Sequence, residues 1–312
     1  MSTLSRTASD LFWMARYLER AESMARLVEM GARMAMLPAR GGTAWDEWRS
    51  VTIAAGCDGH FKTAPADVDA MILGLVVDRE NPSSIVSCFD RARANARSVR
   101  TALSTQAWES LNETWLRLDE LTVSRVLHDL PQVVDWVKGR CAQFRGAADA
   151  TLLRDDRYEF GRLGLFIERV DMTLRLLDVK HFLLLPEMQV VGGDPDRHRW
   201  TSILVATSTL RAYHWAYRGD YSAERILDFL LLSRICPRSY AFCYGEIVEG
   251  LERLARLYGG RHACHSSAVA TLAALGETEV EDVFRSGLHG FLTEALDANN
   301  RLSQEIATAY HF

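Results

Sequence analysis

The sequence predicts an all-α protein, a single large helical bundle over residues 1–312 in which two weakly repeated halves are related by a pseudo-two-fold axis. Apolar residues recur at helical spacing through nearly the whole chain, and strand-like alternation is scarce. Turn signals separate these periodic stretches. A charged pattern around Glu19 returns around Glu168. This repeat places the two halves at about 1–150 and 151–312.

Six helices are expected in the first half. Ser5 or Thr7 can cap the first helix, which should end before Pro38. In the stretch NPSS, Pro82 ends one element and Ser83 can cap the next. We expect helices at about 5–36, 45–55, 66–77, 85–103, 106–128 and 131–153.

A second set of helices follows in the other half. The stretch EMQVVGGDPDR at 187–197 is the clearest linker, with two glycines and a proline. Pro237 suits a first helical turn, and Gly259 suits a helix end. We expect helices at about 156–185, 198–217, 222–233, 238–258, 265–275 and 279–308.

Composition narrows the class of protein. The net charge of −5 argues against binding to bulk nucleic acid. The apolar runs are too short to cross a membrane, and no signal peptide is visible at the N-terminus. The six cysteines are scattered without a regular framework, which is typical of a reducing compartment. The protein is therefore expected in the cytoplasm, bound to neither membrane nor nucleic acid.

The repeated charged pattern is the main functional signal. Residues 11–29 read LFWMARYLERAESMARLVE, and residues 160–178 read FGRLGLFIERVDMTLRLLD. On a helix these charges lie away from the apolar face, so the core does not require them. A solvated stripe needs charge, but it does not need the same charges at matched positions. A buried seam does, because buried carboxylates require guanidinium partners.

Two interpretations remain open for this seam. The charges of each helix form a solvated stripe, held by weak pairs such as Glu22 with Arg26. Alternatively, the two helices share a partly buried Glu/Arg network near the pseudo-two-fold axis. Such a network either fixes helix register or holds an anionic ligand.

Several stretches together resemble the Alpha-E family, a bacterial all-helical domain named for its Glu-Arg motif, over nearly the whole chain. They are LSRTASDLFWMARYLERAESMARLVE (4–29), NPSSI (81–85), ARANARSVR (92–100), WESLN (108–112), FIERVDMTLRLLDVK (166–180) and FLLLSRICPRSY (229–240). The family usually has Gly-Arg just before the second Glu-Arg segment. Here Gly164 is followed by Leu165, so a strictly symmetric site is not expected.

The resemblance implies a functional context but no reaction of its own. Members tend to be encoded beside, or fused to, circularly permuted ATP-grasp proteins and transglutaminase-like proteases. ATP-grasp enzymes join a carboxylate to an amine through an acyl-phosphate. The implied role is a helical partner or assisting subunit of a peptide-forming, amide-forming or peptide-modifying system, with an ATP-grasp or transglutaminase-like protein as partner and a small-molecule or peptide ligand.

The expected site collects polar residues around the two Glu-Arg segments. Asn95 and Arg97 are candidates to complete an anion pocket beside Glu19 and Glu168, which would hold a carboxylate or phosphate. The expected ligand-binding set is Arg6, Arg16, Glu19, Arg20, Asn95, Arg97, Glu168, Arg169, Asp171 and Arg175.

Two rival functions stay open. In one, the chain is an enzyme acting on an amino acid or peptide, with Glu19 and Glu168 as general acid and base. Neighbouring arginines lower carboxylate pKa values, which suits a ligand holder better than an acid near neutral pH. In the other, the seam only locks the bundle or a dimer. No cofactor or metal is expected, because the sequence holds no E-x-x-H pair, no Gly-rich phosphate loop and no paired zinc ligands.

Overall fold

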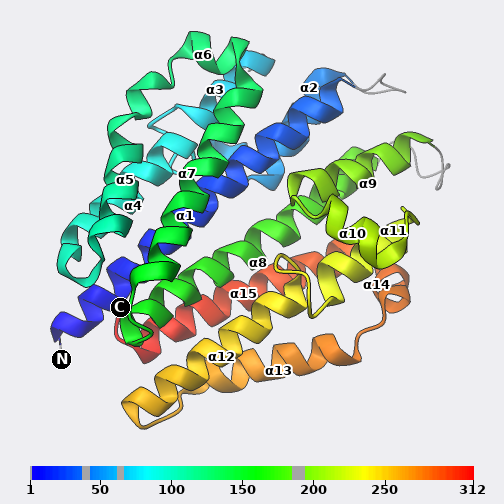
Figure 1. The fold of residues 1–312 in the computed structure, drawn as a ribbon. Coiled ribbons are helices and arrows are strands. Elements are labelled where there is room, and N and C mark those ends of the chain that lie inside the picture. The colour runs from blue at the N-terminus through cyan, green and yellow to red at the C-terminus, as the bar shows by residue number, and fades with distance from the viewer. Residues whose placement is uncertain (1, 37–42, 62–66, 185–193) are drawn as a thin grey trace.

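A computed structural model describes residues 2–36, 43–61, 67–184 and 194–312. Over these ranges the chain is all-α, with fifteen α-helices and no strand (Figure 1). The helices of the first half are α1 (Ser2–Ala35), α2 (Ala44–Ala54), α3 (Val68–Val76), α4 (Ile85–Ser98), α5 (Thr105–Leu116), α6 (Val123–His128) and α7 (Leu130–Thr151). Those of the second half are α8 (Asp156–Leu184), α9 (Asp194–Ala206), α10 (Leu210–Tyr217), α11 (Ala223–Leu227), α12 (Tyr240–Tyr258), α13 (Ala263–Glu277), α14 (Val280–Ser286) and α15 (Leu288–Ala309).

The two helices that carry the repeated pattern lie at the centre of the bundle. Helices α1 and α8 run side by side in the same direction and share the most extensive packing of any pair (Figure 1). A Cβ atom at Gly164 would lie 2.1 Å from the backbone oxygen of Phe12, so only glycine permits this approach. The position matched to Gly164 in the first copy is Ala15, also a small residue. Small side chains thus bring the charged segments together.

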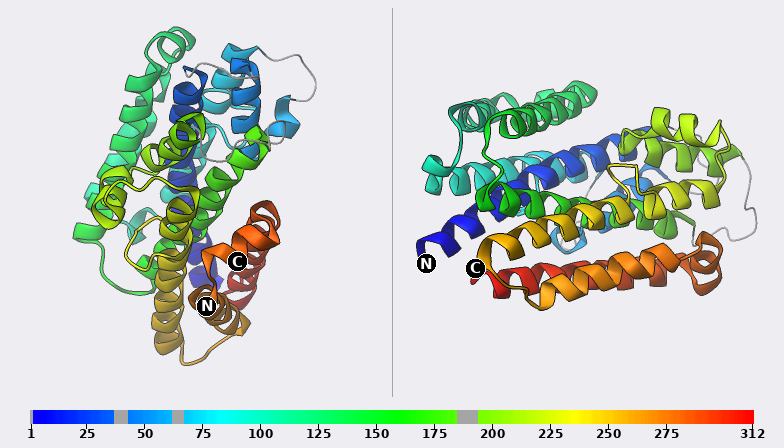
Figure 2. Two further views of the ribbon diagram at one scale, coloured as in Figure 1. Left: turned by 90° about the vertical axis from the view of Figure 1, so that its right-hand side faces the viewer. Right: turned by 60° about the horizontal axis from the view of Figure 1, so that its bottom comes forward.

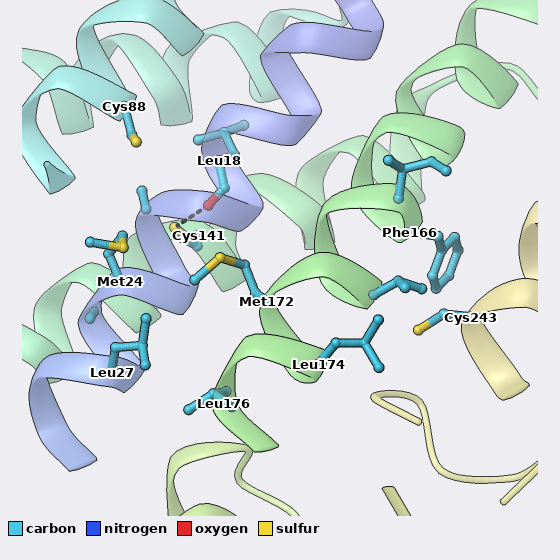
Figure 3. Packing of buried hydrophobic residues seen from close by; sticks show 14 of the residues in the cluster. Leu18, Met24, Leu27, Cys88, Cys141, Phe166, Met172, Leu174, Leu176 and Cys243 are labelled. Atoms are coloured by element: carbon cyan, nitrogen blue, oxygen red, sulfur yellow. Dashed lines mark hydrogen bonds between the residues drawn. The ribbon is translucent and has the colours of Figure 1, made fainter. Parts of the chain in front are cut away.

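Each central helix has its own outer partners. Helices α4 and α7 pack on α1, whereas α12 and α15 pack on α8 (Figure 2). Figure 3 shows the interior, with Cys88 of α4 on the α1 side and Cys243 of α12 on the α8 side. One cluster of buried apolar side chains extends through both halves. The central pair is therefore enclosed on most sides.

The partner helices α4 and α12 begin in the same way. Ser84 is the N-cap of α4, and its hydroxyl oxygen accepts a hydrogen bond from the backbone nitrogen of Ser87 at 3.2 Å. Ser239 caps α12 through the backbone nitrogen of Phe242 at 3.0 Å. A proline lies two residues before each cap. The expected cap at Ser83 is thus displaced by one residue, because Ser84 has the extended backbone of an N-cap.

Four helices expected to be continuous are interrupted. The expected helix 85–103 ends as α4 at Ser98 and is followed by a 3₁₀ turn at Arg100–Ala102. The expected helix 106–128 is divided into α5, a 3₁₀ turn at Leu118–Glu120 and α6. The expected helix 198–217 breaks between α9 and α10 at Ser208, which has a φ of 55°. The expected helix 279–308 breaks at Gly287, which has a φ of 99°. A left-handed residue ends an α-helix, and apolar periodicity continues across such a break.

Most of the expected linker lies outside the residues that the structure describes. Residues 185–193, which hold most of the expected linker 187–197, lie outside the described ranges, and α9 begins at Asp194. No described helix is both long and apolar enough to cross a bilayer. The single-domain organisation and the two-fold relation between whole halves stay predictions.

Candidate functional site

The two Glu-Arg motifs bind each other across the contact between α1 and α8. Arg169 donates from Nε and Nη2 to the two carboxylate oxygens of Glu19, at 2.9 and 3.0 Å. In return, Arg20 donates from Nε and Nη2 to the two oxygens of Glu168, the second bond being 3.0 Å long. The exchange is reciprocal and bidentate in both directions. Guanidinium forks match carboxylate geometry in this way, which lysine cannot do.

Both motif carboxylates are buried. Glu168 is 0% exposed and Glu19 is 1% exposed. The solvated-stripe interpretation is therefore wrong for these residues, and the buried mutual network is the correct one. A buried carboxylate without partners would be strongly destabilising, so the matched arginines explain why the pattern repeats.

Glu168 and Glu19 accept further hydrogen bonds from different sets of arginines. Arg16, one turn before Arg20, donates to Oε2 of Glu168 at 2.8 Å and to the hydroxyl of Ser303 at 2.9 Å. Glu19 instead receives Arg238, which precedes α12, at 3.1 Å and Arg145 of α7 at 3.4 Å. All four carboxylate oxygens of the two motifs thus accept at least one bond from arginine.

A third carboxylate extends the network along α1. Glu22, also 1% exposed, accepts from Arg26 one turn later on the same helix, from Arg145, and from Arg238 at 2.8 Å. Arg26 also donates to the backbone oxygen of Ala206 at 2.8 Å, which ties α1 to the end of α9. Arg145 and Arg238 therefore each bridge Glu19 and Glu22.

The bond between Glu22 and Arg26 of α1 has a counterpart in α8. Asp171 is matched to Glu22, and Arg175 is matched to Arg26. Arg175 donates from Nε to Asp171 at 2.7 Å, so both copies contain an acid and an arginine bonded one turn apart. This pair is the part of the expected ligand-binding set that lies beside the central exchange.

The network holds its carboxylates in the ionised form. Burial alone would raise the pKa of Glu19, but the charges and hydrogen bonds of Arg169, Arg238 and Arg145 hold that pKa far below its usual range. Burial also acts on Glu168, where Arg20 and Arg16 outweigh it and lower the pKa. Glu22 has a lowered pKa for the same reason, although burial and the neighbouring Glu19 oppose it. None of these groups carries an exchangeable proton near neutral pH.

Burial also shifts the pKa values of Arg238 and of two thiols next to the network. Burial lowers the pKa of Arg238 to about 10 against the pull of Glu19, and it remains charged at neutral pH. Burial raises the pKa of the Cys88 and Cys243 thiols to about 12 in each case. These cysteines are therefore neutral apolar groups, and thiolate chemistry requires a lower pKa. In the described residues no cluster of three His, Cys, Asp or Glu side chains could hold a metal ion.

Three residues of the expected set lie elsewhere. Arg6 and Arg97 are exposed, and Asn95 is half-buried on α4. No hydrogen bond or ion pair among the described residues joins them to Glu19 or Glu168. Arg6 lies more than three turns before Glu19 on α1, a rise of roughly 20 Å. The anion pocket of Asn95 and Arg97 stays a prediction.

Two arginines of the network escaped sequence analysis. Arg238 lies within the matching stretch FLLLSRICPRSY, immediately before the cap of α12, and that position was the available signal. Arg145 lies on α7, which also holds Arg140, and nothing in its sequence surroundings marks it. Their selection depends on which helices pack on α1.

Comparison with known proteins agrees with the architecture and the motif. A family model described as a predicted alpha-helical domain with a conserved ER motif matches residues 3–311. An uncharacterized protein of Mycobacterium bovis is 36% identical over 97% of this chain and 36% of its own length. An uncharacterized protein of Mycobacterium tuberculosis strain H37Rv is 35% identical over the same shares.

The relatives are much longer than this chain. The chain spans about a third of the length of the curated relatives it matches. No solved structure matched it. The match of the ER-motif model over nearly every residue, together with the reciprocal Glu-Arg exchange, leads to one conclusion: the chain belongs to the Alpha-E family.

Proposed function

We propose that this chain is an assisting helical subunit of an ATP-grasp-dependent system that forms or modifies peptide or amide bonds. Family membership supports this role, because the resemblance implies partners of the ATP-grasp and transglutaminase-like classes. The length of the relatives supports it as well, since they carry the matching segment within much longer chains. The scattered free cysteines favour a cytoplasmic location.

One observation favours an assisting role over a catalytic one. Glu19 and Glu168 are enclosed by guanidinium groups, and every one of their oxygens accepts a bond from arginine. A general acid or base must reach the proton it transfers and requires a pKa near the working pH. These carboxylates meet neither condition, so the bond-forming chemistry is assigned to a partner.

The partner proposal is tested by recovery of complexes from the native organism. The chain is tagged at one end, cross-linked in cells and purified, and the bound proteins are identified by mass spectrometry. We expect an ATP-grasp or transglutaminase-like protein among them. A tagged variant with Arg169→Met, which disrupts the network, serves as a comparison. Repeated purifications that recover neither class of protein would contradict the proposal.

The catalytic alternative has a separate test. Glu19→Gln and Glu168→Gln keep the size of each side chain and remove its charge. In a system reconstituted with its partners, an assisting role predicts that each variant which remains folded keeps most of the wild-type turnover. A loss of more than a hundredfold in kcat, with unchanged folding, would assign the chemistry to these carboxylates.

A structural role is the second candidate, and the filled network favours it. Each motif carboxylate is satisfied by the chain's own arginines, as expected of a device that sets helix register. If Arg20→Met lowers stability but leaves partner binding unchanged once the protein is folded, the network is architectural. Loss of partner binding at full stability would instead indicate that the network recognises the partner.

A further inference from the structure

A cavity of about 370 Å³ lies beside the network, between α1, α7, α8 and α12. Its walls include Leu11 of α1, Phe144 of α7 and Phe166 of α8. Arg145 and Arg169 separate it from Glu19, since both line the cavity and bond that carboxylate. Its volume lies within the range of roughly 300–1,000 Å³ that is usual for small-molecule sites.

The repeat explains why space exists here. Gly161 and Leu165 line the cavity, and the positions matched to them in the first copy are Phe12 and Arg16. In the first copy these two larger side chains occupy the corresponding space. The Arg16 guanidinium lies 5.7 Å from the centre of the Phe12 ring and donates to Glu168. A Cβ atom at Gly161 would meet nothing within 4 Å. The second copy therefore lacks the two side chains that would fill this volume.

The cavity wall combines positive charge with apolar surface. Four arginines line it, against two acids, Asp149 and Glu246. Both acids are bonded to other wall residues: Tyr158 donates its hydroxyl to Asp149 at 2.9 Å, and Arg162 donates to Glu246. The cavity arginines are Arg145, Arg157, Arg162 and Arg169, and the larger apolar side chains are Leu11, Met14, Phe144, Leu152, Leu165 and Phe166.

Two of the arginines keep donors for a ligand. The hydrogen bonds of Arg145 to described residues all run through Nη1, which leaves Nε and Nη2. Those of Arg157 run from its side chain through Nε and Nη2 to Asp155, which leaves Nη1. Their side chains are 27% and 41% exposed. A ligand can therefore reach both guanidinium groups.

We propose that this cavity binds a small carboxylate that carries an apolar group, such as an N-blocked apolar amino acid or the C-terminal residue of a peptide. The carboxylate lies against Arg145 and Arg157, because planar guanidinium groups bind carboxylates through paired hydrogen bonds. The apolar group lies against Phe144, Leu165 and Phe166. Binding by the isolated chain does not depend on any ATP-grasp partner, so this inference stands apart from the proposed function.

An adjoining groove gives such a ligand room to extend. It has a volume of about 160 Å³ and shares Leu11, Leu152, Arg157 and Tyr158 with the cavity. Its other walls include Ser104 and Thr151 at the ends of α5 and α7. These two hydroxyls are bonded to each other at 2.6 Å, so the groove offers a longer ligand additional volume rather than free hydrogen-bonding groups.

The ligand chemistry is tested with matched probes and the full chain. Binding of N-acetyl-L-phenylalanine is measured by isothermal titration calorimetry and by the shift of the thermal unfolding temperature. N-acetyl-L-phenylalanine amide removes the charge, acetate removes the apolar group, and inorganic phosphate offers a different anion. We expect the acid to bind at least tenfold more tightly than each of the other three. Equal binding of the amide, tighter binding of phosphate, or no binding of the acid would overturn the proposal.

The location is tested with two glycine variants. Gly161→Phe places in the cavity the side chain found at the matched position of the first copy. Gly146→Phe is the control, because Gly146 lies on α7 outside the cavity wall and its Cβ would also meet nothing within 4 Å. We expect Gly161→Phe to weaken binding of N-acetyl-L-phenylalanine at least tenfold, and Gly146→Phe to leave it unchanged. Unchanged binding by a folded Gly161→Phe variant would refute the location.

A pair of arginine variants provides an independent test. Arg157→Gln removes one of the two proposed carboxylate contacts, and Arg117→Gln removes an arginine of equal exposure that is also paired with a nearby acid but lines neither the cavity nor the groove. We expect at least a fivefold loss of affinity in the first variant and none in the second. Equal affinities in both would exclude Arg157 from the site, and with it the proposed orientation of the ligand.

Discussion

The two motif carboxylates occupy matched positions, yet their surroundings differ. Glu168 is bonded by Arg16 and Arg20, both from α1 and one turn apart. Glu19 is bonded by three arginines from three separate parts of the chain: Arg169 on α8, Arg238 before α12 and Arg145 on α7. A single helix supplies the partners of Glu168, whereas the partners of Glu19 are brought together by the tertiary fold.

The difference follows from one position in the repeat. Where the first copy has Arg16, the second copy has Leu165, which cannot reach Glu19 with a charge. Other elements supply the missing cation, and the volume that the arginine would have filled remains as part of the cavity. The two carboxylates therefore differ in their surroundings. Among the described residues, Glu168 is bonded only by arginines of α1, whereas Glu19 is bonded by Arg145 and Arg169, which line the cavity.

The largest expected loss of stability comes from removing an arginine that is bonded to Glu168. Arg20→Met leaves the fully buried Glu168 with Arg16 alone and should lower the free energy of unfolding by about 3–5 kcal/mol. Arg145→Met leaves Glu19 with Arg169 and Arg238, and Glu22 with Arg26 and Arg238, and should cost only about 1–2 kcal/mol. Urea denaturation of both variants measures the difference. Equal losses would show that the number of remaining arginines does not decide the cost.

The pH dependence of stability tests whether both sides hold ionised carboxylates. The pKa values of Glu19 and Glu168 are lowered in the folded state, so the unfolded chain binds more protons as the pH falls through its own carboxylate pKa near 4.3. The free energy of unfolding should therefore decrease from pH 5 toward pH 3, by up to about 1.4 kcal/mol per pH unit for each group.

Two single variants serve as controls for this slope. Glu168→Gln and Glu19→Gln each remove one titrating group, so the slope of each should be less steep than that of the wild type by a similar amount. Denaturant melts at each pH between 3 and 6 give both slopes. A wild-type slope retained in Glu168→Gln would mean that this carboxylate does not titrate differently in the two states.

A charge placed at the asymmetric position tests the local two-fold directly. Leu165→Arg restores the residue type of Arg16 at its matched position, from which it should reach Glu19. The stability lost in Arg145→Met, about 1–2 kcal/mol, should then be largely recovered in the double variant with Leu165→Arg. A double-mutant cycle from urea melts measures the coupling. Additive effects of the two changes would show that the two-fold does not extend to this position.

The smallest expected effect concerns the helix caps, where the two halves agree. Ser84→Ala and Ser239→Ala each remove a side chain that accepts a backbone N–H at the start of α4 or α12. Each should lower the free energy of unfolding by about 1 kcal/mol, because that N–H loses its partner. Thermal and urea unfolding provide the measurement. A loss above about 3 kcal/mol in only one variant would contradict the matched roles of these caps.

Local patterns in the sequence predicted much of this molecule. Apolar periodicity located every long helix, and the repeated Glu-Arg pattern singled out Glu19, Arg20, Glu168 and Arg169, whose burial and mutual pairing the structure then decided. The interruptions at Ser208 and Gly287 were missed, because apolar spacing continues across a single left-handed residue. The place of Asn95 beside the motif stays a prediction, because no hydrogen bond or ion pair among the described residues joins its side chain to Glu19 or Glu168.

The sequence by itself determined the all-α class, the family and the need of each motif carboxylate for an arginine. These properties follow from spacing along one helix and from the cost of burying charge, both of which are local. Only the tertiary structure decided that Arg145 and Arg238 complete Glu19 and that a cavity opens beside Leu165. The physical reason is that these contacts join segments up to 219 residues apart, and their choice depends on how the helices pack.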